Sequence, residues 1–395
     1  MLNNISAVVG CLLQSFCAYF YSYEMFLIGR VLTGINNGAN TVVCPMYLAE
    51  IAPKSIRGGV GALFQLTLIS GVVISFVFGF DSLLGNAKYW PCLFSVPLVF
   101  GVIQCFVLPF CVESPRFLLT NEGRLSCEFA LRQIRPNNYD VGTEVDEIMA
   151  ENDQQGEIKS PKWSEFIFDK TLSKPLLLAV VITVSQQFCG INSLTVYSTP
   201  LFDAALPQSI TADDPELANY IVVGSGLVSF AFTALSVFLV DRIGRKRSHL
   251  IGLSGMAVCM FISAFLLSDL EIDDSQACHG IKISGSFANY SLIGLLLLYI
   301  AFFGIGPAAV PWLITPELFN GNSRSRGVSL VTTINWLCNF TVVFGFLPLQ
   351  NLICGWVFLI FFILTVCCIV FLYFKLPEVR GGDAIAVIAT NIQRL

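Results

Sequence analysis

Charged side chains are scarce in this sequence. Only 12% of its 395 residues are Asp, Glu, Lys or Arg, and only two are histidine, whereas soluble proteins average about 25% charged residues. Hydrophobic residues make up 55% of the chain, and the formal net charge is −5. This composition excludes a disordered chain, a nucleic-acid-binding protein and an ordinary soluble enzyme. It predicts an all-α membrane protein with several spanning helices, whose surroundings are a lipid bilayer.

Sequence signatures of metal, cofactor or covalent chemistry are also missing. The 14 cysteines lie mostly within apolar runs, as Cys367 and Cys368 do, and none is spaced with histidine as zinc ligands are. The sequence has no Walker loop, no HExxH and no nucleophile elbow. The first apolar run lacks the basic flank and cleavage site of a signal peptide, so it is predicted to span the membrane. We therefore expect neither an enzyme nor a cofactor-binding protein.

Long apolar runs, in contrast, are abundant. A spanning helix needs about 20 largely apolar residues, and ten segments of the sequence are candidates. They are residues 5–21, 25–48, 58–80, 91–111, 176–200, 219–240, 248–268, 289–315, 327–349 and 352–374. The eighth is interrupted by Pro307 and Pro311.

One connection is much longer than the others. Residues 112–174 separate four spans from six and contain 8 of the 22 Lys and Arg residues and 12 of the 27 Asp and Glu residues. Within it, 122–134 and 143–153 have the periodicity of short amphipathic helices. The chain thus divides into four predicted parts. They are a partial first bundle (1–111), a polar loop (112–174), a six-helix second bundle (175–376) and a tail (377–395).

Lys and Arg are unequally distributed between the two sides of the predicted spans. Nineteen lie in one set of loops and in the tail, whereas only Lys88 and Lys282 lie in the opposite set. Cytosolic loops carry the excess of Lys and Arg, so the long loop and both termini are predicted to be cytosolic. The Asn289-Tyr-Ser sequon would then lie on the outer side, as a candidate glycosylation site.

The two predicted bundles repeat one charge pattern. Glu50 and Arg57 end one span and begin the next, and Glu317 and Arg324 do the same in the second bundle. Glu50 and Glu317 are 267 residues apart, and so are Arg57 and Arg324. This spacing predicts a parallel repeat of two bundles. Because the second bundle has six spans and the first has four, the repeat also predicts that two spans are absent before the first residue.

A series of short motifs follows the order typical of one transporter family. They are Gly29-Arg30, Pro45-Met-Tyr-Leu-Ala-Glu50, Arg57-Gly58, Glu113-Ser-Pro-Arg116, Gln186-Gln187-Phe-Cys-Gly190-Ile-Asn192, Asp241-Arg-Ile-Gly-Arg245-Lys246, Gly306-Pro307, Pro311-Trp312, Glu317-Leu-Phe and Asn335-Trp336. Over residues 1–380 the sequence resembles the sugar porters of the major facilitator superfamily, and most of all the animal facilitative glucose transporters. The resemblance implies the major facilitator fold with two parallel halves. Because members have twelve helices, the chain resembles one that begins at the third.

The resemblance implies a sugar site made of amides and an indole. Amide side chains suit sugar hydroxyls because they both donate and accept hydrogen bonds without a charge to desolvate. An indole can stack on a sugar and donate one hydrogen bond. The alternative for each residue is helix packing or helix–helix hydrogen bonding. The predicted sugar contacts are Gln65, Gln186, Gln187, Asn192, Trp312 and Asn335, and the residues that resemble aromatic gates are Tyr197 and Phe303.

Charged residues on the predicted cytosolic side resemble a latch of that family. There, acids and bases of the two bundles pair with each other and hold the outward-open state; several weak ion pairs together can bias a two-state motion. The alternative is that these residues are topology signals and helix caps. The predicted latch residues are Glu50, Arg57, Glu113, Arg116, Asp241, Arg242, Arg245, Glu317 and Arg324.

Four positions depart from the glucose-transporter pattern, and at one of them Val196 replaces the first of two tyrosines. Gly304 replaces a glutamate near the sugar, Ser229 replaces an asparagine, and Thr183 begins Thr-Val-Ser in place of Gln-Leu-Ser. A missing hydrogen-bonding group costs about 1–3 kcal/mol if its partner stays unsatisfied. We therefore expect sugar recognition to differ from that of the glucose transporters.

The resemblance implies uncoupled transport of a hexose across the plasma membrane by alternating access. No acidic residue lies deep within the predicted spans, which also favours facilitated diffusion. One alternative is a proton-coupled or non-hexose porter of the same superfamily, whose acid would lie in the absent first helix. Another is a truncated chain that does not transport.

Overall fold

The computed structural model describes residues 2–53, 56–153, 166, 170–206, 216–268, 286–319 and 321–376. Helices account for almost all of these residues. The first part of the chain forms α1 (Leu2–Phe16), α2 (Tyr23–Ile51), α3 (Arg57–Phe78), α4 (Trp90–Leu93), α5 (Val96–Val107) and the 3₁₀ turn η1 (Leu108–Phe110). The loop forms α6 (Pro115–Asn121), α7 (Arg124–Ile134) and α8 (Val141–Asp153). The last part forms α10 (Lys170–Phe188), α11 (Ile191–Val196), α12 (Ser198–Ala205), α14 (Leu217–Ile243), α15 (Arg245–Ser268), α16 (Ser286–Ile305), α17 (Val310–Glu317), α18 (Gly321–Ile353), η2 (Cys354–Trp356) and α19 (Val357–Lys375).

The predicted class, an all-α membrane protein, is confirmed. Each of the ten predicted spans is helical, and eight helical segments in the described residues are long and apolar enough to cross a membrane. The first two predicted spans are not among the eight. Helix α1 has only 15 residues, and the middle of α2 contains Arg30, Asn36, Asn37 and Asn40, which lower its hydropathy. The count of ten spans therefore stays a prediction.

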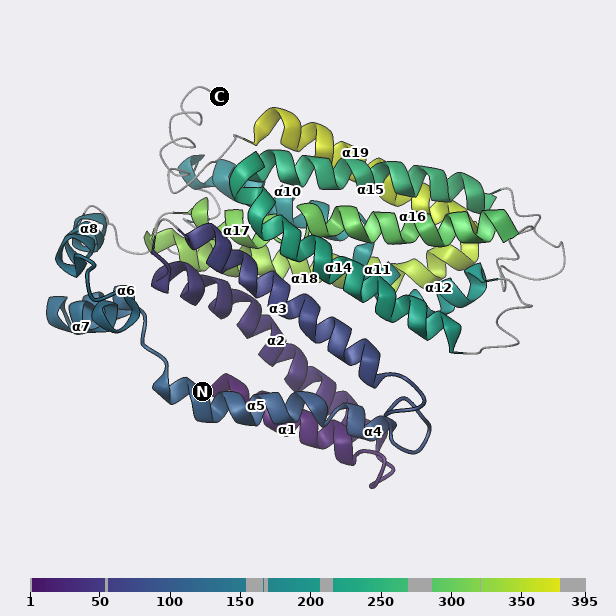
Figure 1. Cartoon of the computed structure of the whole chain (residues 1–395), viewed down its shortest axis with the longest axis horizontal. Coiled ribbons are helices and arrows are strands. Elements are labelled where there is room, and N and C mark those ends of the chain that lie inside the picture. The colour runs from purple at the N-terminus through teal and green to yellow at the C-terminus, as the bar shows by residue number, and fades with distance from the viewer. Residues whose placement is uncertain are drawn as a thin grey trace.

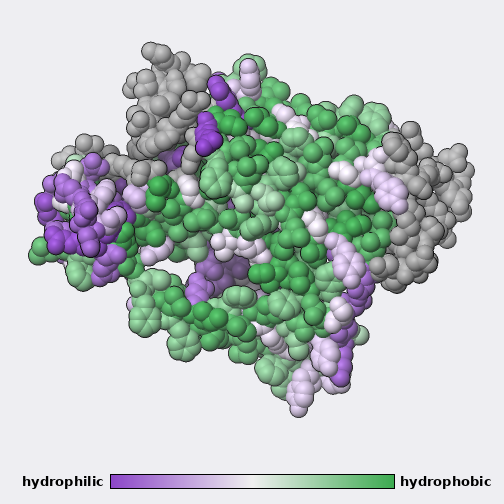
Figure 2. Space-filling view, in the orientation of Figure 1, coloured by the Kyte–Doolittle hydropathy of each residue, from purple (hydrophilic) through white to green (hydrophobic). Residues whose placement is uncertain are grey.

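The long helices run side by side, and a separate small lobe formed by α6–α8 lies beyond one end of them (Figure 1). Helix α3 packs against α14 and α17, which brings the early part of the chain into contact with the late part. Hydrophobic side chains cover the outside of the long helices, whereas hydrophilic ones gather on the lobe (Figure 2). This distribution is that of helices surrounded by lipid, with a polar lobe at the end.

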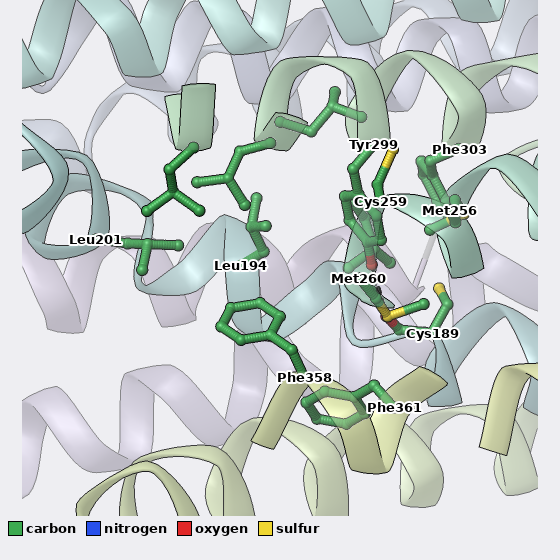
Figure 3. Close-up of a cluster of buried hydrophobic side chains, with 14 of the residues drawn as sticks. Cys189, Leu194, Leu201, Met256, Cys259, Met260, Tyr299, Phe303, Phe358 and Phe361 are labelled. Carbon is green, nitrogen blue, oxygen red and sulfur yellow. Dashed lines mark hydrogen bonds between the residues drawn. The ribbon is translucent and has the colours of Figure 1, made fainter. Parts of the chain in front are cut away.

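The late helices, α10–α19, have a well-packed core, and the early helices, α1–α5, do not. In the most apolar window of Leu172–Val196, 61% of residues are buried, whereas none is buried in that of Trp90–Phe110. Figure 3 shows the core around Tyr299 and Phe303 of α16, with Phe358 and Phe361 of α19 on the opposite side. The early helices thus leave most of their apolar surface to the surroundings.

Two spanning segments are interrupted, and side chains hydrogen-bond the backbone that each break frees. Between α10 and α11, Gly190 adopts a positive φ of 82°, and the Tyr299 hydroxyl donates to the Cys189 carbonyl at 2.5 Å. Between α16 and α17, the Ser248 hydroxyl donates to the Ile305 carbonyl at 2.8 Å. Backbone groups inside a membrane need such partners, because hydrocarbon supplies none.

The helices predicted for the long loop are confirmed as α7 and α8, which begin and end within two residues of the predicted limits. They pack around a small core of their own that includes Cys127, Leu131 and Val145. The predicted tail, 377–395, and most of 154–169 lie outside the described residues. The fourfold division of the chain therefore stays a prediction.

Close contact between α15 and the end of α16 depends on Gly306. A Cβ atom there would lie 2.3 Å from the Ser248 carbonyl oxygen, which cannot move without the backbone. We expect Gly306→Ala to lower the free energy of unfolding by about 1–3 kcal/mol through overpacking. Thermal unfolding of purified protein measures it. Gly294→Ala in α16 is the matched control, because nothing lies within 4 Å of its Cβ position; equal Tm values for the two variants would contradict the prediction.

Candidate sugar site

A polar cavity lies among helices from both parts of the chain. About 160 Å³ of it is accessible to the centre of a water-sized sphere, whereas about 10–15 Å³ by this measure holds one water. The cavity therefore has room for a ligand of several non-hydrogen atoms. Its polar lining consists of Thr41, Gln65, Gln186, Gln187, Asn192, Thr195, Ser198, Ser225, Ser229, Trp312, Asn335, Trp336 and Asn339. All six predicted sugar contacts are in this wall, and none of the described lining residues is charged.

Four amides form a connected cluster on one side of the cavity. Gln187 donates from Nε2 to the Asn335 side-chain oxygen at 2.7 Å. The Gln187 Oε1 atom accepts from Asn192 at 2.5 Å and from Asn339 at 3.2 Å. Each amide has donors and acceptors to spare, so the cluster can exchange some of these bonds for bonds to a ligand's hydroxyls.

Gln186 points to a different place, the break between α16 and α17. Its Nε2 atom donates to the carbonyls of Pro307 at 2.8 Å and of Ala308 at 3.2 Å. Gln186 therefore has both of the roles that the sequence left open, since it lines the cavity and joins two helices. Its oxygen is the part of the amide left for a ligand.

The early helices contribute Gln65 and Thr41. Gln65 is only 4% exposed, and its amide has no hydrogen bond within the described part of the chain. Its amide atoms are not among the fully buried unpaired atoms, so they face the cavity, where a ligand or water can bind them. Next to it, Phe64 packs edge-on against Trp312 with ring centroids 5.7 Å apart.

One hydrogen bond crosses the cavity between early and late helices. The Trp336 indole N–H donates to the Thr41 hydroxyl at 3.1 Å. Neither this pair nor Asn339 was among the predicted contacts. Asn339 was recognisable from its spacing, because residues i and i+4 share a helix face and Asn335 was predicted to contact sugar. No sequence signal singles out Thr41.

Comparisons with known proteins agree with this site. The family described as "Sugar (and other) transporter" matches residues 1–387. The chain belongs to this sugar transporter family. It is 35% identical over 382 residues to the facilitated glucose transporter member 1 of solute carrier family 2 from Gallus gallus, covering 96% of this chain and 74% of that protein. It is 34% identical over 384 residues to member 3 from Oryctolagus cuniculus, covering 96% and 73%.

Solved structures agree on the fold of this family. The proton:xylose symporter XylE of E. coli superposes with a TM-score of 0.79 at 20% identity, over 99% of this chain and 82% of that one. The fucose:proton symporter of E. coli superposes with a TM-score of 0.57 at 16% identity, over 95% and 83%. This sugar transporter family member therefore has the major facilitator fold and is an integral membrane protein, and it is not an enzyme.

The two predicted gate residues lie in different surroundings. Phe303 is buried and lines the cavity. The Tyr197 ring stacks on Phe346, with centroids 5.5 Å apart, while its neighbours Thr195 and Ser198 line the cavity. The Tyr197 hydroxyl donates to the Val343 carbonyl at 3.4 Å. Tyr197 thus joins the α11–α12 junction to α18 beside the cavity.

The predicted latch residues lie at the end of the long helices next to the lobe, and the ion pair that the structure resolves is within the late helices. Arg245 at the start of α15 pairs with Glu317 at the end of α17. Glu50 accepts from the Ser114 hydroxyl at 2.5 Å, and the Glu113 carboxylate accepts from the Ser114 backbone N–H at 3.0 Å. The first contact joins two late helices, the second joins the end of α2 to the residues that follow η1, and the third lies within those residues.

For the remaining latch residues and the sequon residue, the structure gives burial or backbone conformation. Arg242 is exposed, and Arg324 is partly buried and makes contacts of its own. Arg116 at the start of α6 is also partly buried. The backbone is helical at Arg57, Asp241 and the sequon residue Asn289, but their side chains lie outside the description.

Ser229, Gly304 and Thr183, which depart from the glucose-transporter pattern, lie in different places relative to the cavity. Ser229 lines the cavity, as expected. Gly304 does not face it, because a Cβ there would lie 2.8 Å from the Phe232 Cβ and 3.0 Å from the Thr233 nitrogen of α14. Position 304 is thus a site of close helix packing, and the expected effect of Gly304 on sugar recognition stays a prediction. Thr183 donates to the Ala179 carbonyl at 2.7 Å and lines a small separate hollow that it shares with Thr41 and Trp312.

A buried serine–histidine pair stands directly behind the amides. Ser185 and His249 are both fully buried, with Ser185 Oγ 3.0 Å from His249 Nε2. Because Ser185 donates its own hydrogen to the Ile182 carbonyl at 2.6 Å, Nε2 must be the donor to Ser185. In the part of the chain that is described, His249 Nδ1 then has no partner.

This direction of donation makes the two single variants unequal. Ser185→Ala leaves a buried Nε2–H without an acceptor, so we expect a loss of about 1–3 kcal/mol in the free energy of unfolding. His249→Leu removes the donor together with its unpaired Nδ1 and is expected to cost less. The double variant should recover most of the loss. Thermal unfolding of the three variants measures this, and additive effects would refute the assignment.

Proposed function

We propose that this sugar transporter family member carries a hexose down its gradient by alternating access. The observation that supports the proposal is the uncharged cavity, whose amides come from early and late helices at once. A hexose presents hydroxyls that donate and accept, and amides match both without the cost of burying a charge. The similarity to facilitated glucose transporters favours a glucose-like sugar.

In this proposal the two moving bodies are residues 1–111 and 175–376. The amides of the late helices and Gln65 of α3 bind opposite sides of the sugar, so its position depends on both bodies. Trp312 covers the sugar from the α16–α17 break, with Phe303 and Tyr197 closing the other side. Rocking requires contacts between the bodies to break, and the Trp336–Thr41 hydrogen bond is one of these.

The proposed orientation places the α6–α8 lobe and both termini on the cytosolic side of the plasma membrane, because 19 Lys and Arg residues lie on that side. The predicted latch residues then form the cytosolic ends of both bodies. Single exposed ion pairs contribute about 0–1 kcal/mol, so the latch would bias the outward-open state only through several pairs that form and break together.

Stereospecific uptake tests the substrate class. We expect cells that lack their own hexose carriers to take up labelled D-glucose but not L-glucose once the chain reaches their surface. Uptake should be independent of an imposed pH gradient, since no described residue of the cavity wall titrates. Loss of uptake when the pH gradient is removed would identify proton coupling and contradict uniport.

Gln65 tests the site itself. We expect Gln65→Leu to raise the apparent KM for D-glucose about three- to tenfold, the equivalent of one lost hydrogen bond of about 0.5–1.5 kcal/mol. Gln104→Leu is the matched control, because Gln104 is an exposed glutamine of α5 outside the cavity wall. Zero-trans uptake kinetics at equal surface expression measure both variants. Equal KM values would remove Gln65 from the site.

A further inference from the structure

Helix α7 of the lobe has two apolar faces. One is buried in the lobe, where Cys127 and Leu131 are fully covered. The other is exposed, and there Leu125 is 82% and Phe129 is 68% accessible. Residues four apart lie on the same side of a helix, so these two side chains form one outward stripe. An amphipathic helix of a soluble lobe needs only the first face, and the second therefore indicates a further apolar partner.

The lobe is held firmly against the end of α2, which fixes where this stripe lies. Arg135, directly after α7, donates to the Ile51 carbonyl at the C-terminal end of α2 at 2.9 Å. Its guanidinium is 4% exposed and pairs with Glu144 at 2.7 Å, whose hydrogen bond raises the pKa of Arg135 above its usual value. The Tyr47 hydroxyl of α2 also donates to the Val112 carbonyl at 2.5 Å. These contacts place the lobe beside the C-terminal end of α2.

A groove separates α7 from the chain that leaves the apolar span of α5. One wall is formed by Cys111, Val112 and Glu113, which directly follow η1, and the opposite wall includes Leu125 and Phe129. About 460 Å³ of the groove is accessible to the centre of a water-sized sphere. In Figure 1, α7 lies between α8 and the end of α5. The groove thus begins at the level where the spanning segment ends.

The stripe on α7 continues a surface that already contacts lipid. Helix α5 and η1 expose Phe100, Phe106 and Phe110, the last at 88%. None of the most apolar window of Trp90–Phe110 is buried, so the bilayer is the surroundings of these rings. The groove begins at Cys111, directly after Phe110, and Leu125 and Phe129 lie in its opposite wall, so the α7 stripe borders this apolar surface.

The charges beside the stripe favour the apolar part of the lipid over an anionic headgroup. Arg132 pairs with Glu128 at 2.6 Å, and Arg124 pairs with Asp146 at 2.8 Å. Each arginine near the stripe therefore already has a carboxylate. Such pairs can stay in the headgroup layer while apolar side chains next to them enter the acyl boundary.

We propose that α7 is an interfacial helix, with Leu125 and Phe129 inserted into the lipid leaflet next to the end of α5, while the carboxylates of Glu113 and Glu122 in the same groove stay at the level of the headgroups. The lobe would then rest on the membrane surface instead of standing free of it. This proposal concerns the lobe and not the sugar cavity, so its test is independent of transport.

Photo-crosslinking of the full chain in phosphatidylcholine bilayers tests the proposal. Phe129→p-benzoyl-phenylalanine and Leu125→p-benzoyl-phenylalanine should yield peptides carrying a phospholipid adduct. The matched control is the same replacement at Ala150, an exposed residue of α8, where we expect several-fold less adduct. Crosslinks from 129 to protein in place of lipid, or equal lipid adduct at 150, would overturn the proposal.

Quenching of tryptophan fluorescence is a second test, for use if the yield of photo-crosslinks is low. In vesicles with brominated acyl chains, Phe129→Trp should add fluorescence that is quenched by bromine and shielded from aqueous iodide, above the signal of the chain's five tryptophans. Ala150→Trp should show the reverse. Iodide quenching at position 129 equal to that at 150 would show that the stripe faces water, which would contradict lipid insertion.

Discussion

Hydrocarbon offers no hydrogen-bond partner, and the rest of this structure follows from that constraint. Backbone groups at a helix break inside the membrane therefore need partners from the protein. The two helix breaks are possible only because Tyr299, Ser248 and Gln186 supply hydrogen bonds to the freed carbonyls. The same breaks bring Trp312 and the amides to one cavity. The helix breaks, stabilised by these hydrogen bonds, thus also position the residues of the site.

The constraint also explains why the amides bond to one another. Gln187 has three amide partners, which satisfy most of its hydrogen-bonding capacity. A sugar replaces amide–amide bonds with amide–hydroxyl bonds of similar strength, and the net gain is small. Weak binding suits a carrier, because the substrate must leave on the other side.

The early and late helices differ in how much they depend on each other. The late helices bury their apolar faces in a core of their own, which Figure 3 shows around Tyr299. The early helices bury far less, and α3 packs closely along α14. Polar contacts then connect the lobe to the early helices at the end of α2, with Arg135 at the centre. Movement of α2 would therefore move the lobe, and with it the exposed stripe of α7.

The sequence by itself determined the class, the helical segments and most of the site. Long apolar runs require helices in lipid, and the resemblance to the sugar porters pointed to Gln65, Gln187 and Asn335 as residues of one site. Only the tertiary structure decided which partners they take. It showed Gln186 bonded to the Pro307 carbonyl, Thr41 opposite Trp336, and Gly304 packed on α14 and not in the cavity. The physical reason is that the direction in which a side chain points depends on helix rotation and crossing, which arise from contacts between residues up to 295 positions apart.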